Sequence, residues 1–129
     1  MDIKKRVLIV TDGTDSIKTI ADSIASCLTG NNVKICPAES FKGTDLLPAH
    51  VFFLGCTNPV PESYQYLSEL LAHINLSGRR CGVFSDSAKA LKYLSGLVKS
   101  SEAVQGEPLL AGDGTIKQAE IKKWLKGIL

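Results

Sequence analysis

Strong charge of either sign, long apolar runs and paired cysteines are all missing from this sequence. The 129 residues carry 15 Lys and Arg against 13 Asp and Glu, and the resulting net charge of +2 is too small to indicate a nucleic-acid surface. No apolar stretch approaches the length of a signal sequence or of a membrane span. We therefore expect a cytoplasmic protein that binds neither nucleic acid nor a membrane.

The four cysteines exclude two kinds of site. They stand at Cys27, Cys36, Cys56 and Cys81, with no close pairing and no metal-ligand spacing. We interpret them as reduced thiols in apolar surroundings. Cys56 follows a predicted strand, where a thiol could reach a ligand, but no arginine-bearing phosphate loop follows it as a thiol phosphatase would require.

Short apolar runs alternate with helical patterns along the chain. The runs lie at 7–10, 51–55, 81–84 and 109–111. Continuous apolar runs of this length predict strands that are covered on both faces. Between them, apolar residues recur at helical spacing, as in Ile17, Ile20, Ala21, Ile24 and Leu28. The alternation predicts one domain, residues 1–129, in which helices cover both faces of a parallel sheet.

The second strand indicates the order of the sheet. Residues 33–37 alternate apolar with polar side chains and end at a proline, which is typical of an edge strand. An alternating second strand beside continuously apolar ones favours a five-stranded sheet of order 2-1-3-4-5, with 109–111 at the other edge. Ligands of such sheets bind beyond the carboxyl ends of the strands.

The loop after the first strand is rich in hydroxyl groups and opens into a helix. A helix start presents free backbone N–H groups and the positive end of the helix dipole, so the loop is a predicted phosphate seat. Asp12 and Asp15 lie in the same loop. A carboxylate about 5 Å from a phosphate, at an effective dielectric near 20, opposes binding by roughly 3 kcal/mol. Asp15 either faces the ligand or caps the helix that follows.

The order of elements, the first loop and the segment 44–59 resemble the flavodoxin family. In that family an aspartate-leucine-leucine segment leads into a third strand that ends in glycine, a small residue and a proline-bearing loop. The residues that match are Asp45, Leu46, Leu47, Gly55, Cys56, Thr57 and Pro59. The resemblance implies a flavodoxin-like, doubly wound three-layer α/β sandwich, FMN as cofactor and electron transfer to a redox partner protein. It also implies that the third and fourth loops hold the flavin ring.

The first loop and the resemblance together give a predicted cofactor site. It comprises Thr11, Asp12, Gly13, Thr14, Asp15, Ser16, Ile17, Cys56, Thr57, Asn58, Pro59, Ser85, Asp86 and Ser87. We predict no catalytic residue and no metal ligand, and we favour an electron carrier or binding domain over a catalyst. Asp86 or Ser87 is also a candidate cap for the next helix.

Scarcity of aromatic residues leaves a second function open. Phe, Trp and Tyr make up 6% of the chain, and the loops 56–61 and 85–88 contain no ring that could stack on a flavin. Any bound FMN is therefore expected to bind weakly. The alternative is a flavin-free flavodoxin-like module with a protein-interaction or regulatory role.

Overall fold

The computed structural model describes residues 5–46, 48–59, 61–111 and 116–128. Leu47, part of the predicted leucine-leucine segment, lies outside these ranges. The strands are β1 (Arg6–Thr11), β2 (Asn32–Pro37), β3 (Val51–Gly55), β4 (Arg80–Ser85), β5 (Val104–Gln105) and β6 (Leu109–Leu110). The helices are α1 (Asp15–Ser26), α2 (Gly43–Leu46), α3 (Gln65–His73), α4 (Ala88–Ser100) and α5 (Gln118–Lys126), with 3-10 turns η1 (Ala38–Ser40) and η2 (Glu62–Tyr64).

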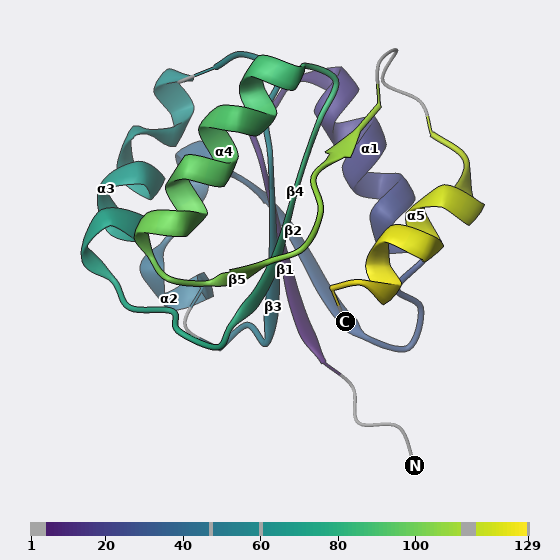
Figure 1. Cartoon of the computed structure of the whole chain (residues 1–129), viewed down its shortest axis with the longest axis horizontal. Coiled ribbons are helices and arrows are strands. Elements are labelled where there is room, and N and C mark those ends of the chain that lie inside the picture. Colours follow the sequence, from purple (N-terminus) through teal and green to yellow (C-terminus); the bar gives the residue numbers. More distant parts are fainter. Residues whose placement is uncertain (1–4, 47, 60, 112–115, 129) are drawn as a thin grey trace.

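The strands form one parallel sheet of order β2-β1-β3-β4-β5, in which β6 also pairs with β4. This confirms the predicted order and the edge position of the second strand. Val10 of β1 lies between Cys36 of β2 and Leu54 of β3 in the register. Because all strands run the same way, their carboxyl ends share one edge of the sheet, which lies at the top of Figure 1.

The fifth position of the sheet differs from the single strand predicted at 109–111. Two strands of two residues each, β5 and β6, pair with opposite ends of β4. The break between them falls at Gly106, Glu107 and Pro108, and proline has no N–H to donate to the ladder. A Cβ on Gly106 would lie 2.5 Å from Cγ1 of Ile128, so the chain at the break packs tightly on the C-terminal segment.

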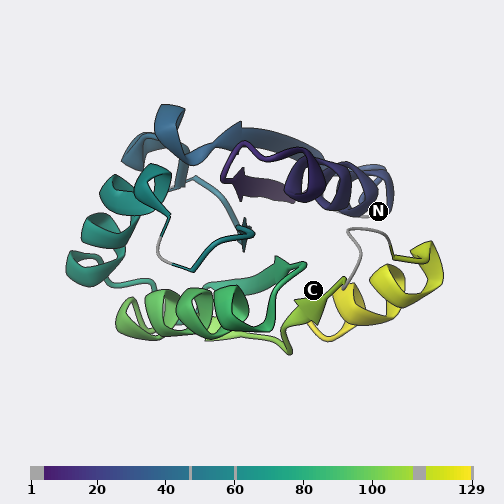
Figure 2. The same ribbon diagram turned by 90° about the horizontal axis from the view of Figure 1, so that it is seen from above.

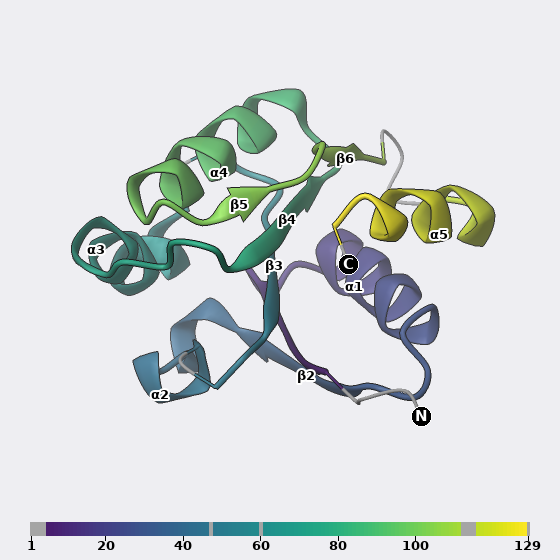
Figure 3. The same cartoon turned by 60° about the horizontal axis from the view of Figure 1, so that its bottom comes forward.

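Helices cover both faces of the sheet. Figures 1 to 3 show α1 and α5 on one face and α2, α3 and α4 on the other. Alternate residues of β1 pack into the two helical layers, because successive side chains of a strand point to opposite faces of the sheet. Val7 and Ile9 pack with the α1 and α5 side, whereas Leu8 and Val10 pack with the α3 and α4 side. Within the described ranges, every helix is too short or too polar to span a membrane.

Candidate functional site

The first predicted loop joins β1 to α1 and is held by hydrogen bonds between its own residues. Gly13 has a φ of 83°, a conformation that residues with a Cβ rarely adopt. The Asp12 carboxylate accepts hydrogen bonds from the Thr14 N–H at 3.1 Å and from the Thr14 hydroxyl at 2.6 Å, both on Oδ1. Thr14 is the N-cap residue of α1 and makes no side-chain cap bond. Asp15 is the first residue of α1, so it does not take the capping position that was one of its two interpretations.

Thr57 lies in the loop after β3 and forms hydrogen bonds with the other two predicted loops. Its N–H donates to Oδ2 of Asp12 at 2.8 Å, and its hydroxyl donates to Oδ1 of Asp86 at 2.5 Å. Oδ2 of Asp86 accepts a further bond from the hydroxyl of Ser16 at 3.0 Å. Two carboxylates therefore lie where the loops meet, and each uses both of its oxygens.

The loop after β4 is fixed by its two serines. The buried Ser85 hydroxyl donates to the Cys56 carbonyl at 2.5 Å and accepts from the Ser87 N–H at 2.9 Å. Ser87 is the N-cap residue of α4 and accepts a hydrogen bond from the Ala90 N–H at 3.4 Å. Ser87, rather than Asp86, is thus the helix cap, which leaves Asp86 to face the other two loops.

Cys56 follows β3 and is fully buried. Burial, followed by the charges of Asp12 and Asp86, raises the pKa of its thiol to about 12. Burial also raises the pKa of the Cys81 thiol to about 12. Because the thiolate is the reactive form of cysteine, Cys56 is a packed, neutral side chain and not a nucleophile at neutral pH. All four cysteines are free thiols, as expected from their spacing.

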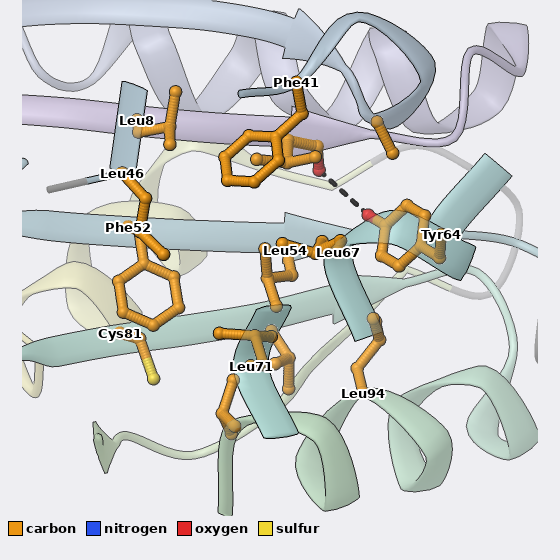
Figure 4. Packing of buried hydrophobic residues seen from close by; sticks show 14 of the residues in the cluster. Leu8, Phe41, Leu46, Phe52, Leu54, Tyr64, Leu67, Leu71, Cys81 and Leu94 are labelled. Atoms are coloured by element: carbon orange, nitrogen blue, oxygen red, sulfur yellow. Dashed lines mark hydrogen bonds between the residues drawn. The ribbon is translucent and has the colours of Figure 1, made fainter. Parts of the chain in front are cut away.

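Tyr64 packs at the carboxyl ends of β1 and β3. Its ring is fully buried among Phe41, Leu67 and their neighbours, with its hydroxyl turned toward the sheet (Figure 4). The hydroxyl accepts a hydrogen bond from the Gly55 N–H at 3.0 Å and lies within bonding distance of the carbonyl oxygens of Val10, at 3.1 Å, and Gly55. Burial raises the pKa of Tyr64 well above its ordinary value, so the hydroxyl stays protonated. It holds the ends of β1 and β3 together.

Replacing Tyr64 with phenylalanine is expected to lower the free energy of unfolding by about 1–3 kcal/mol, because the buried Gly55 N–H loses its acceptor. Tyr66→Phe is the matched control. Its hydroxyl accepts from the Gly43 N–H at 3.2 Å, but the side chain is 49% exposed, so water can replace it and the expected cost is below about 1 kcal/mol. Urea unfolding of both variants measures the difference, and equal losses would contradict the support that we assign to Tyr64.

The structure brings some of the predicted site residues together and leaves others apart. Those that meet through hydrogen bonds between loops are Asp12, Ser16, Cys56, Thr57, Ser85 and Asp86. Ile17 is fully buried in the layer between α1 and the sheet, so its side chain does not face the other two loops. Asn58 and Pro59 are exposed and make no hydrogen bond to the part of the chain that the structure describes.

Many of the donors where the loops meet are already engaged. A phosphate monoester needs N–H and hydroxyl donors. The N–H and hydroxyl groups of Thr14 and Thr57 and the hydroxyl of Ser16 already donate to carboxylates, whereas the N–H groups of Ser16 and Ile17 do not. Among the described residues, no buried side-chain nitrogen or oxygen lacks a partner. The described loop residues 56–59, 61 and 85–88 include no aromatic ring to cover a flavin.

A hollow at the opposite edge of the sheet was not predicted. This cavity of about 500 Å³ lies at the amino ends of β1 and β2 and is lined by residues that include Arg6, Leu8, Asn32, Lys34 and Pro48. α2 is a single turn of four residues and covers less of β2 than a full helix would. Sequence periodicity carries no signal for such a hollow, because it depends on what fails to pack against the strand.

Comparisons with known proteins give structural matches alone. No protein-family model matches the sequence, and no curated protein does. The structure is similar to a flavodoxin of Streptococcus pneumoniae TIGR4, with a TM-score of 0.76, 18% identity and coverage of 95% of both chains. It is similar to Flavodoxin 2 from Bacillus cereus, with a TM-score of 0.77, 18% identity and coverage of 95% of this chain and 96% of the other.

A third similar structure is a short-chain flavodoxin associated with a non-canonical PDU bacterial microcompartment. Its TM-score is 0.74 at 16% identity, and the match covers 98% of this chain and 97% of the other. Likeness over nearly whole chains at such low identity establishes the arrangement of the backbone. It carries no information on ligands, because ligand binding depends on individual side chains.

Proposed function

We propose that this chain, which has a flavodoxin-like fold, works without bound FMN as a protein-interaction module. One observation carries the proposal: in the predicted phosphate seat, the N–H and hydroxyl of Thr14 donate to Asp12 and the hydroxyl of Ser16 donates to Asp86. To use these donors a phosphate would have to displace both carboxylates and then remain close to their charges. Each such charge at about 5 Å opposes binding by roughly 3 kcal/mol.

Exposed apolar side chains support the interaction role. Val104 is 53% exposed and Leu110 is 50% exposed, and they belong to the two short strands at one edge of the sheet. Large apolar side chains at an accessible sheet edge are typical of surfaces that bind other proteins.

Freshly purified protein is expected to show no flavin absorbance, and FMN titration by calorimetry is expected to show no saturable binding up to about 1 mM, which corresponds to roughly 4 kcal/mol. Fluorescence of the supernatant after heat denaturation is the control for flavin that stays trapped. A yellow protein, or a nanomolar dissociation constant, would refute the flavin-free proposal.

A second candidate is an electron carrier that binds FMN weakly and passes electrons to a redox partner protein. The N–H groups of Ser16 and Ile17, in the first turn of α1, donate to no residue in the described ranges and remain available to an anion. Bound flavin would supply one-electron chemistry. The same titration decides between the candidates, because saturable FMN binding at micromolar concentrations, about 8 kcal/mol, favours the carrier.

A further inference from the structure

We infer that Asp12 and Asp86 are the residues that exclude phosphoryl ligands from the start of α1, because their carboxylates place negative charge beside it and accept from the hydroxyls of Thr14 and Ser16. This inference rests on the proposed flavin-free function and names the residues responsible for it. It concerns this chain's own side chains and is separate from the fold.

The carboxylates are fixed from several directions. Both bonds on Oδ1 of Asp12 come from Thr14, and Oδ2 is held by the N–H of Thr57. Asp86 is held by the hydroxyls of Thr57 and Ser16. Thr57 therefore links the two carboxylates, and an incoming phosphate can use the hydroxyls of Thr14, Ser16 or Thr57 only by breaking these bonds.

The charges of the two carboxylates are not neutralised locally. Neither Asp12 nor Asp86 pairs with a lysine or arginine among the described residues. Their combined field reaches the neighbouring Cys56, whose pKa both carboxylates raise in addition to the effect of burial. A phosphate dianion close to these two carboxylates would also be repelled by their charges.

A purely structural role predicts a different outcome from exclusion. If the carboxylates only hold the loops together through hydrogen bonds, replacing them should loosen the loops and admit ligands of any charge. If they exclude phosphoryl groups, the gain in affinity should depend on the phosphate. Asparagine suits this test because it keeps one acceptor oxygen while it removes the charge.

The experiment compares Asp12→Asn, Asp86→Asn and the double variant with the wild type. Asp22→Asn, at an exposed position in the middle of α1, controls for the loss of one negative charge elsewhere. The probes are FMN, riboflavin, which lacks the phosphate, and inorganic phosphate. We expect the double variant to bind FMN at least about 100-fold more tightly than the wild type, with riboflavin affinity unchanged within about threefold. Inorganic phosphate should compete with FMN in the double variant, and D22N should behave as the wild type.

Two results would overturn the inference. Folded variants that gain no FMN affinity would show that the carboxylates do not exclude phosphate, and equal gains for FMN and riboflavin would assign the effect to loop opening. Circular dichroism reports folding, and if the double variant does not fold, D86N is judged by the same criteria with a gain of about 10-fold or more expected. Wild-type protein that already binds FMN tightly would instead overturn the proposed function, so the two failures can be told apart.

Discussion

Replacing Gly55 with alanine is expected to lower the free energy of unfolding by about 3 kcal/mol or more, the upper range for overpacking a buried core. Gly55 ends β3 and lies beside Phe84 of β4 in the parallel register. A Cβ at this position would lie 2.8 Å from Cδ2 of Phe84 and closer still to two further ring atoms. Phe84 is fully buried between the sheet and α1, so the ring has no free space into which it could move.

Thermal unfolding measures the effect, and a loss of this size corresponds to a fall in Tm of roughly 10 °C. Gly96→Ala is the matched control with the opposite sign. Gly96 lies within α4, and a Cβ there would meet nothing within 4 Å, so alanine should stabilise the helix by about 1 kcal/mol. Adding Phe84→Leu to the Gly55 variant should recover part of the loss, because it removes the ring atoms in question. A Gly55 variant as stable as the wild type would refute the packing that we describe.

Cys56 is expected to react with iodoacetamide at pH 8 about 1,000-fold more slowly than an ordinary accessible thiol. The raised pKa of about 12, against 9.0 for an unperturbed thiol, lowers the thiolate fraction by that factor, and full burial slows the reaction further. Peptide mapping by mass spectrometry over time reports each cysteine separately. The partly exposed Cys27 is the internal reference, and Cys81 should be protected in the same way as Cys56.

Unfolding in urea should abolish the protection of Cys56 and Cys81, because their pKa values are raised by burial, which is lost in the unfolded chain. Alkylation of Cys56 as fast as Cys27 in the folded protein would mean that the loops around Cys56 open readily. In that case the bonds from Thr57 to Asp12 and Asp86 would not persist in solution.

The fold followed from the sequence because its signals are local. The apolar runs at 7–10 and 51–55 and the helical spacing from Ile17 to Leu28 each report burial within one element. An alternating strand that ends at Pro37 is typical of a sheet edge, and β2 lies at the edge. The break at Gly106 to Pro108 was missed, because a two-residue strand on either side of a turn is too short to show a period.

The sequence predicts which loops form the site, but it does not predict which side chains form hydrogen bonds between those loops. The position of loops 11–17, 56–59 and 85–87 at one edge follows from parallel strands alone. A cap at Asp86 or Ser87 could be expected because N-cap residues have a strong type preference, and the structure places Ser87 there. The partners of Asp86 could not, since the hydroxyls of Ser16 and Thr57 lie 70 and 29 residues away in the sequence.

The sequence by itself determined a parallel sheet of order 2-1-3-4-5 between two helical layers, since the period of apolar residues sets which side chains are buried in each element. It also determined that hydroxyls and carboxylates share the first loop. Only the tertiary structure decided that Thr57 brings Asp12 and Asp86 together and that their carboxylates accept from the hydroxyls of Thr14 and Ser16 in that loop. The physical reason is that hydrogen bonds between loops depend on the approach of distant segments to within about 3 Å, and no local pattern in a sequence encodes that distance.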